Sequence, residues 1–373
     1  MKTYPSIRYA RARRYGMPVP EDAAEEAPLA VCPQRESRLG GVHGPSDPGN
    51  PMSEDCLRMT IHTPDPDGCN PVMVWLPGGA FVTGCGEFAR YDGSRLCEEG
   101  GIVVVRISYR VGMLGYTNEN GVNLSIEDQI CALEWVRDHI RSFGGDPSRV
   151  TVCGQSAGAY SIACIVARGR TDLMRAAILF SAPLALKATA ADADRLRGMM
   201  RQALSASNGP ESTDALTHAS WQQLIEAQEQ VMGKLAKPMP FCPVNEPVFP
   251  RRGQQIKGLE QVLLTCQGND AQPFVRSRWM SRAMTWLVFR RPMRRYAAAL
   301  RRAGVQVSTR VFRWHPENGE IGACHTMEVP FLLGNWECWK DANMLTGLSR
   351  DEYETRGMEF RKEISDFVKK NPA

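Results

Sequence analysis

The sequence lacks the features that mark a membrane, secreted or metal-binding protein. It has no apolar run long enough to span a bilayer. Its basic start, MKTYPSIRYARARRYG, is not followed by an apolar segment, so we expect no secretory signal and a cytoplasmic location. The twelve cysteines include no CxxC pair and no metal-like cluster with histidine. We therefore expect reduced thiols, no metal and no membrane span.

A strong charge of one sign is also missing. The 373 residues carry a net charge of +4, with 43% hydrophobic and 23% charged side chains. A nucleic-acid-binding chain would show a strongly basic stripe, so we expect no nucleic-acid partner. The length suits one large α/β domain or two smaller ones, with enough residues to bury a sizeable core.

Short apolar runs bounded by glycine and proline alternate with helical periodicity beyond residue 55. This alternation predicts an α/β fold with a central, mostly parallel sheet and helices on both faces. The predicted strands are Arg58–Thr63, Val72–Leu76, Ile102–Ser108, Arg149–Cys153, Ala176–Phe180, Glu260–Cys266 and Val305–Trp314. The predicted helices are Ile126–Phe143, one beginning near Ala157, and Glu352–Lys369. We expect residues 1–55 to be irregular and residues 185–240 to form a helical excursion over the sheet edge.

The stretch VCGQSAGAY places Ser156 between two glycines, after a predicted strand and before a predicted helix. This is the context of a GxSxG nucleophile elbow, in which a sharp turn holds the serine hydroxyl above the sheet. The amide of Ala157 would then lie at a helix N-terminus, where it can donate to an oxyanion. The alternative is that small residues merely end a strand, and the strand–helix context favours the catalytic interpretation.

A second small-residue segment, LPGGAF at 76–81, also follows a predicted strand. Consecutive small residues let main-chain amides face an incoming carbonyl without obstruction, as an oxyanion loop requires. Taken alone, the segment would be interpreted as a simple Gly-Gly turn.

Several motifs, in collinear order, resemble those of the type-B carboxylesterase family, the cholinesterase-like branch of the α/β-hydrolases. They are EDCLRMTIHTP at 54–64, NLSIEDQICALEWV at 123–136, FGGDPSRVTVCGQSAG at 143–158 and HTMEVPF at 325–331. The resemblance covers most of the chain. It implies one α/β-hydrolase catalytic domain over 1–373, with 185–240 as a small helical cap.

The resemblance also implies the roles of individual residues. Ser156 would be the nucleophile and His325 the general base, and no cofactor would be needed. The amides of Gly79, Ala80 and Ala157 would form the oxyanion hole. The implied partner is a small-molecule ester, and the resemblance leaves the oligomeric state open.

The acid of the triad is less directly implied, because the family usually supplies a glutamate. In LLTCQGNDAQPF, at 263–274, Asp270 falls where that glutamate falls, and α/β-hydrolases use either acid. Asp270 could instead be an ordinary turn residue in a Gly-Asn-Asp cluster. Glu246 and Glu260 are the alternative acids.

Three further features follow from comparison with the family pattern. Arg14 and Glu54 match a structural ion pair. Cys32 and Cys56 match a cysteine pair that is bridged in secreted members, and in a cytosolic protein the bridge can be absent. Pro77 stands where the family often has histidine, which predicts altered loop stiffness rather than loss of activity.

The chain is short between Asp270 and His325, which predicts a trimmed, more open site walled by residues 185–240 and 276–302. The second wall carries nine arginines, with Trp279, Trp286 and Phe289 interleaved. We interpret it as a solvated helix pair whose aromatic side chains pack inward. A face for a membrane surface or an anionic partner is the alternative.

The predicted activity is hydrolysis of carboxylic esters through an acyl-enzyme. Two alternatives remain at this point. One is a non-catalytic binding or scaffold paralogue that keeps the fold. The other is an amidase, lactonase or polyester hydrolase, because acyl transfer to water uses the same triad in each.

Overall fold

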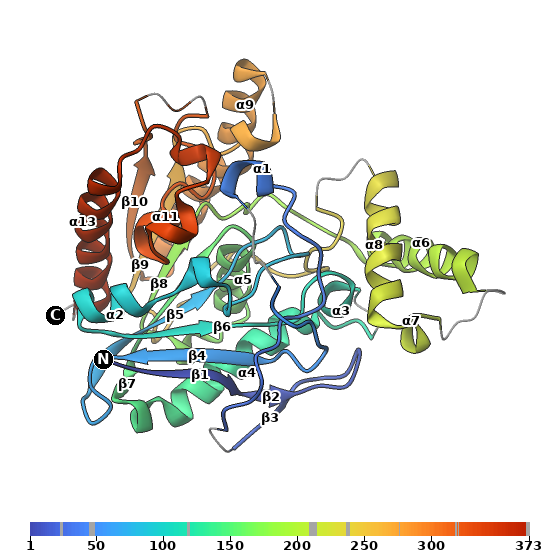
Figure 1. The fold of residues 1–373 in the computed structure, drawn as a ribbon, viewed down its shortest axis with the longest axis horizontal. Coiled ribbons are helices and arrows are strands. Elements are labelled where there is room, and N and C mark those ends of the chain that lie inside the picture. Colours follow the sequence, from blue (N-terminus) through green and yellow to red (C-terminus); the bar gives the residue numbers. More distant parts are fainter. Residues whose placement is uncertain are drawn as a thin grey trace.

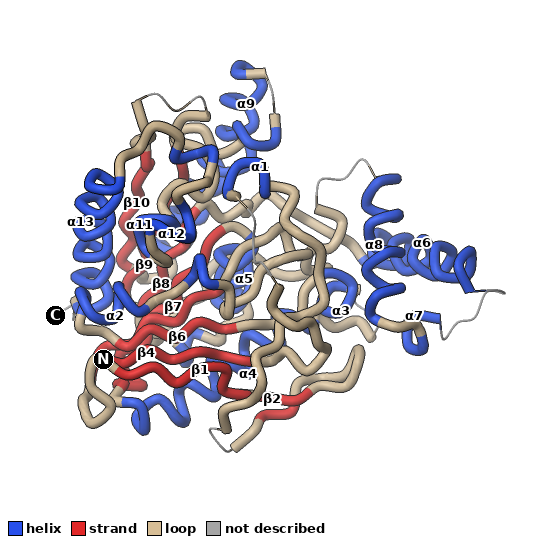
Figure 2. The backbone as a smooth tube through the Cα atoms, viewed as in Figure 1, coloured by secondary structure: helices blue, strands red, loops and turns tan. Residues whose placement is uncertain are grey.

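The computed structural model describes residues 1–22, 25–44, 49–117, 120–208, 215–235, 239–275, 277–317, 319 and 321–370. Within these ranges an eight-stranded sheet forms the centre of the molecule, in the order β1-β4-β6-β5-β7-β8-β9-β10 (Figures 1 and 2). Strands β6, β5, β7, β8, β9 and β10 run parallel, whereas β4 is antiparallel to β6 and to β1. The sheet is mostly parallel, as predicted.

The strands of this sheet are β1 (Lys2–Arg8), β4 (Arg58–Thr63), β5 (Asn70–Leu76), β6 (Val103–Ile107), β7 (Gly145–Gln155), β8 (Ala176–Phe180), β9 (Gln261–Gln267) and β10 (Gln306–Phe312). A small separate pair joins β2 (Ala10–Arg11) to β3 (Val19–Pro20). The predicted bounds of β4 and β8 are confirmed, while β7 begins earlier than predicted, at Gly145.

The helices are α1 (Gly40–His43), α2 (Ser94–Gly100), α3 (Gly112–Tyr116), α4 (Leu124–His139), α5 (Ala157–Ala167), α6 (Ala190–Asn208), α7 (Ala215–His218), α8 (Trp221–Lys234), α9 (Arg278–Met284), α10 (Arg291–Arg302), α11 (Val329–Leu332), α12 (Trp336–Trp339) and α13 (Arg350–Lys369). A π-helical segment, Thr285–Arg290, joins α9 to α10. Short 3₁₀ turns lie at Ala89–Tyr91, Ile140–Phe143, Thr171–Leu173, Gln272–Phe274 and Asn343–Leu345. In the described ranges, none of the helices combines the length and the apolar character needed to cross a lipid bilayer.

The central strands are apolar on both faces because helices cover both. In β5, Val74 belongs to one core cluster and its neighbour Trp75 to the other, and both are fully buried. Such alternation is expected because successive side chains of a strand point to opposite faces. Helices α4, α5 and α10 contribute to the first cluster, and α2 and α13 to the second. The predicted helices on both faces are therefore confirmed.

The prediction that residues 1–55 are irregular is wrong for the first strand. Residues Lys2–Arg8 pair antiparallel with β4 and form one edge of the sheet. The register shifts between Tyr4 and Ile7, and Ser6 between them has a positive φ of 48°. Pro5 has no amide hydrogen to donate to a ladder, so the strand bulges there and loses the regular alternation that would have revealed it.

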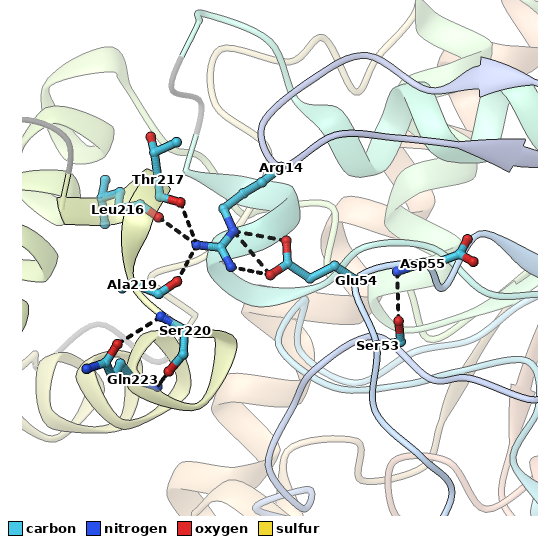
Figure 3. Close-up of polar contacts among 9 residues, drawn as sticks. All are labelled: Arg14, Ser53, Glu54, Asp55, Leu216, Thr217, Ala219, Ser220 and Gln223. Atoms are coloured by element: carbon cyan, nitrogen blue, oxygen red, sulfur yellow. Dashed lines mark hydrogen bonds and ion pairs between the residues drawn. The ribbon is translucent and has the colours of Figure 1, made fainter.

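Helices α6, α7 and α8 extend to one side of the sheet, away from α13 (Figure 1). The side chain of Arg14 links them to the N-terminal region (Figure 3). Its Nη1 donates to the carbonyls of Leu216, at 3.2 Å, Thr217, at 2.9 Å, and Ala219. Its Nε donates to Glu54 Oε2 at 2.9 Å. The expected ion pair is present, and it also anchors the helical excursion.

Candidate active site

Ser156 lies at the sharp turn between β7 and α5. Its backbone has φ 53° and ψ −114°, a region that L-residues rarely adopt. The amide of Ser156 donates to the carbonyl of Phe180 on the neighbouring strand at 2.8 Å. A Cβ added to Gly158 would lie 2.1 Å from the carbonyl oxygen of Leu76, so only glycine fits there. The structure therefore has the strained strand–turn–helix geometry expected of a nucleophile elbow.

The LPGGAF segment forms a tight loop after β5. Gly79, Ala80 and Phe81 all have positive φ values, of 135°, 54° and 67°. A Cβ on Gly79 would lie 2.1 Å from the carbonyl oxygen of Thr83, which excludes any other residue without movement of the loop. Gly79 and Ala80 line the same cavity as Ser156. Ala157 is the first residue of α5, where an amide has no partner within the helix.

His325 and Asp270 are paired in the interior. The Nδ1 atom of His325 lies 2.8 Å from Asp270 Oδ1, and both side chains are buried. The second oxygen of Asp270 accepts the amide hydrogen of Gln267, the last residue of β9, at 2.7 Å. Because its carboxylate has two fixed partners, Asp270 can hold the imidazole in one orientation.

The two alternative acids lie elsewhere. Glu246 is paired with Arg168, whose Nε donates to Glu246 Oε2 at 2.9 Å. Glu260 is paired with Arg175 at 2.8 Å. Asp270 is thus the residue that the structure places beside His325.

The other ring nitrogen of His325 contacts Gln155, a residue to which sequence reasoning gave no role. The Nε2 atom of His325 lies 3.1 Å from Gln155 Nε2, which also lies 3.1 Å from Thr326 Oγ1. The amide of Gln155 can donate to an Nε2 that carries no proton, which places the ring proton on Nδ1, facing Asp270. No hydrogen bond joins Ser156 Oγ to His325 among the described residues. Gln155 is adjacent to the serine in the GxSxG motif, and that position was the available signal.

Glu328 is a second residue that sequence reasoning missed, although it lies in the HTMEVPF motif. It is buried, and its Oε2 accepts a hydrogen bond from Gln267 Nε2. Burial, reinforced by the charge of Asp270, raises the pKa of Glu328 to about 8. The carboxyl group is therefore neutral at pH 7 and adds no second charge beside Asp270.

His43, in α1, also reaches the site from a segment predicted to be irregular. It is buried and lines the cavity that contains Ser156 and His325. Burial, with the nearby positive charge of Arg90, lowers the pKa of His43 to about 3. Its Nε2 has no hydrogen-bond partner among the described residues. A neutral imidazole thus lines the cavity that contains Ser156 and His325.

A cavity of about 500 Å³ opens over Ser156 and His325. Most of its wall is apolar. The rings of Phe274 and Phe289 lie against His325, with centroid distances of 5.6 Å and 5.3 Å. Further apolar lining residues are Leu39, Val82, Phe88, Leu186, Met232, Met239, Val275, Met284, Val288 and Trp339. Residues from 185–240 and from the α9–α10 region both line the cavity, as predicted.

The interpretation that the aromatic side chains of residues 276–302 pack inward is wrong for the two tryptophans. Trp279 is 76% exposed and Trp286 is 43% exposed, whereas Phe289 is buried. The inward positions of this helical stretch are occupied instead by small polar side chains, Ser281 and Thr285. Arg276 lies outside the described residues.

The cysteines show no bridge at the expected pair. Cys32 and Cys56 are both buried free thiols. A hydrogen bond with Cys32, together with burial, raises the pKa of Cys56 well above its usual value, so the Cys56 thiol is protonated at neutral pH. Within the described ranges, no three His, Cys, Asp or Glu side chains gather in a way that could hold a metal ion.

Residues 1–272 match the model of the carboxylesterase family. The chain belongs to the carboxylesterase family. It is 34% identical, over 97% of its length and 87% of the relative, to a probable N-octanoylanthranilate hydrolase of Rhodococcus erythropolis. It is 29% identical to a phenmedipham hydrolase of Pseudarthrobacter oxydans, over 92% of this chain and 79% of the relative. The resemblance found in the sequence is confirmed.

Solved structures give the same family. A PNB esterase superposes with a TM-score of 0.85 at 27% identity, covering all of this chain and 87% of its own. A thermophilic PNB esterase gives a TM-score of 0.83 at 27% identity, with 100% and 88% coverage. The fold is therefore that of the α/β-hydrolases, and this carboxylesterase is a carboxylic ester hydrolase.

Proposed function

We propose that this carboxylesterase works through an acyl-enzyme on Ser156, with His325 as general base and Asp270 as the acid of the triad. The observation that carries the proposal is the buried 2.8 Å pair of His325 and Asp270, because His325 lines the same cavity as the strained Ser156. A nucleophile, a base and a group that orients the base are the three parts that such chemistry needs.

The first step requires the Nε2 atom of His325 to take the proton of Ser156 Oγ while Ser156 attacks the ester carbonyl. For this step Nε2 exchanges its contact with the Gln155 amide for one with the serine hydroxyl. The Asp270 carboxylate stabilises the imidazolium that forms. The tetrahedral oxyanion accepts hydrogen bonds from the amides of Gly79, Ala80 and Ala157.

The second half of the reaction regenerates the enzyme. His325 gives its proton to the leaving alcohol, and the carbon–oxygen bond of the ester breaks to leave the acyl group on Ser156. A water molecule then loses a proton to His325 and attacks the acyl carbon. The acid is released and Ser156 regains its proton.

The apolar cavity supports a substrate with an aliphatic or aromatic acyl group of medium size. Its volume of about 500 Å³ and its methionine-rich wall suit flexible chains better than small acetyl groups. The name of the Rhodococcus erythropolis relative describes an octanoyl group. We therefore propose esters of medium-chain acids as the preferred class.

Cleavage of an N-acyl bond is a second candidate, because the same relative is named for an N-octanoyl compound. The triad would be unchanged, and His325 would protonate a leaving amine in place of an alcohol. The matched pair p-nitrophenyl octanoate and N-octanoyl p-nitroanilide separates the two activities with one acyl chain.

We also propose that residues 1–373 act as one catalytic domain in which 185–240 forms a helical cap. Met232 of α8 and Met239 line the cavity, so this segment borders the substrate. A reducing, cytoplasmic location is supported by free cysteines at the Cys32 and Cys56 pair.

The test is hydrolysis of p-nitrophenyl esters from acetate to octanoate by the wild type, Ser156→Ala and Ser161→Ala. Ser161 is a buried serine on α5 whose hydroxyl donates to the carbonyl of Ala157, so it serves as the matched control. We expect Ser156→Ala to lower kcat by roughly 10⁵-fold or more, and Ser161→Ala to remain active. A wild type inert toward every ester, or an active Ser156→Ala, would overturn the proposal.

A further inference from the structure

One outer face of the molecule concentrates exposed apolar side chains. Of the twelve large hydrophobic side chains that are exposed among the described residues, six lie between 274 and 287. They are Phe274, Trp279, Met280, Met284, Trp286 and Leu287, and we call them the docking face. Soluble monomeric proteins rarely expose a contiguous apolar patch larger than roughly a few hundred Å². Patches above that size mark sites of interaction with a partner or a membrane.

Helical spacing brings these side chains together. Met280, Met284 and Leu287 follow an i, i+4, i+7 pattern, and Trp279 and Trp286 are seven residues apart. The buried residues of the same stretch, Ser281, Thr285 and Phe289, occupy the other side. Helix α9 and the π-helical segment Thr285–Arg290 thus turn an apolar surface outward, and α9 protrudes at the upper edge of the molecule (Figure 1).

Positive charge surrounds the docking face. Residues 277–302 contain eight arginines and no acidic residue. Among the described residues, none of these arginines has a carboxylate partner in an ion pair. The guanidinium of Arg294 lies 5.0 Å from the ring centre of Trp286, so charge and aromatic surface are adjacent. Four of these arginines are Arg278 and Arg282 on α9 and Arg291 and Arg294 on α10.

The docking face also borders the catalytic cavity. Phe274 and Met284 are exposed at the surface and line the cavity that contains Ser156. The ring of Phe274 lies 5.6 Å from that of His325, centre to centre. The exposed apolar surface is therefore continuous with the apolar wall of the site.

We propose that the docking face binds the surface of anionic lipid, with the apolar side chains entering the interface and the arginines contacting the head groups. Tryptophan, methionine and leucine beside arginine are the composition of interfacial helices. A second copy of this chain is a poorer occupant, because a symmetric contact would bring two unpaired arginine clusters together. A protruding apolar helix without acidic residues suits a lipid surface of opposite charge.

The docking has a consequence for the substrate. If the proposed function also holds, an amphiphilic ester in the lipid would reach Ser156 along apolar surface, past Phe274 and Met284. Binding to lipid itself does not depend on the proposed function. The two claims can therefore fail separately.

The experiment is co-sedimentation with vesicles of phosphatidylcholine alone and of equal parts phosphatidylcholine and phosphatidylglycerol, at low and high salt. The variants are Trp279→Ser with Trp286→Ser, and Arg278→Gln with Arg282→Gln. The matched control is Met358→Ser, which removes a 56% exposed apolar side chain from α13. Circular dichroism and hydrolysis of p-nitrophenyl acetate report whether each variant is folded and retains basal activity.

We expect binding to the anionic vesicles only, weakened by salt. Each arginine near an anionic surface raises the partition coefficient about fivefold. Replacing both Arg278 and Arg282 should therefore lower partitioning onto the vesicles roughly 25-fold. Each tryptophan replaced should lower the partition coefficient about tenfold, and Met358→Ser should leave partitioning unchanged. The proposal is overturned if the wild type ignores anionic vesicles, binds both compositions equally, or keeps its binding in both double variants. Light scattering that shows a dimer dispersed by the tryptophan changes, without vesicle binding, would overturn it in favour of self-association.

Discussion

The two sides of the cavity that contains Ser156 differ in burial and in how their side chains are held. On the sheet side, Ser156, His325 and Asp270 are buried, and main-chain strain or hydrogen bonds fix each of them. On the side of α9, Met284 and Val288 line the cavity, and Trp286 and Leu287 between them are exposed. The difference shows where precision is needed, because bond-making tolerates little displacement, whereas apolar contact with a substrate tolerates variation.

Arginine is also used differently in α5 and in α9. At the C-terminal end of α5, Arg168 lies between two carboxylates, Glu127 at 2.6 Å and Glu246. On α9, Arg278 and Arg282 have no carboxylate partner among the described residues. The paired arginine holds elements of the fold together, while the unpaired ones keep their charge available to a ligand of opposite sign.

The largest effect should come from Asp270→Asn, because it changes the hydrogen bond that orients His325 on the sheet side of the cavity. An asparagine would favour the wrong tautomer of His325, and we expect kcat to fall by about 10³- to 10⁴-fold with little change in stability. Steady-state kinetics on p-nitrophenyl esters measures the effect. Glu260→Gln, which removes the carboxylate paired with Arg175, is the control, and equal activity of the two variants would refute the role of Asp270.

Gly79→Ala tests the loop after β5, which also lies on the sheet side of the cavity. The added Cβ would meet the carbonyl oxygen of Thr83 at 2.1 Å, and the loop that we propose to carry the oxyanion amides must shift. We expect a loss of about 10²- to 10³-fold in kcat, the effect of one missing oxyanion donor. Gly198→Ala on α6 is the control, since no atom lies within 4 Å of its Cβ position. Full activity of Gly79→Ala would show that this loop does not carry the oxyanion hole.

Arg14→Ala tests how the helical side is held in place. It removes the ion pair to Glu54 and leaves the carbonyls of Leu216, Thr217 and Ala219 without their shared donor. We expect the free energy of unfolding to fall by about 2–4 kcal/mol in urea denaturation. Arg137→Ala removes a solvent-exposed pair with Asp138 and should cost about 0.5 kcal/mol or less. Equal costs would mean that Arg14 is not an anchor.

Glu328→Gln should leave stability at low pH unchanged and be visible as a change in the pH dependence of stability. The pKa of Glu328 is raised to about 8 by burial, above its ordinary value of 4.5. The folded state thus binds a proton that the unfolded state has released, and this group's contribution to stability is lost as the pH rises from 4.5 through 8.

Glutamine keeps the shape of the neutral acid and cannot ionise. The variant should match the wild type near pH 5 and exceed its stability near pH 8 in thermal unfolding. Parallel pH profiles for the two proteins would contradict the raised pKa.

The sequence predicted those elements whose local residue pattern matches the secondary structure that they adopt in the folded protein. Arg58–Thr63 alternates polar with apolar side chains and Ala176–Phe180 is continuously apolar, and the structure has the same bounds for both strands. The pairing of Asp270 with His325 was expected from motif position, and the structure brings the two together across 55 residues of sequence.

Other features depend on tertiary packing that no local pattern reports. The edge strand Lys2–Arg8 is interrupted at Pro5, so its alternation is hidden. The contact of Gln155 with Nε2 of His325 joins residues 170 apart in the chain. Periodicity gives no sign of which face of α9 is buried, because Ser281 and Thr285 point inward while Trp279 points outward.

The central claim is that Ser156 is the nucleophile, and covalent labelling tests it most directly. The wild type would be treated with a fluorophosphonate, and the adduct would be located by intact-protein mass and peptide mapping. We predict one adduct per chain, on Ser156, with labelling lost in Ser156→Ala and slowed in Asp270→Asn. An unlabelled wild type, or an adduct on another serine, would contradict the account.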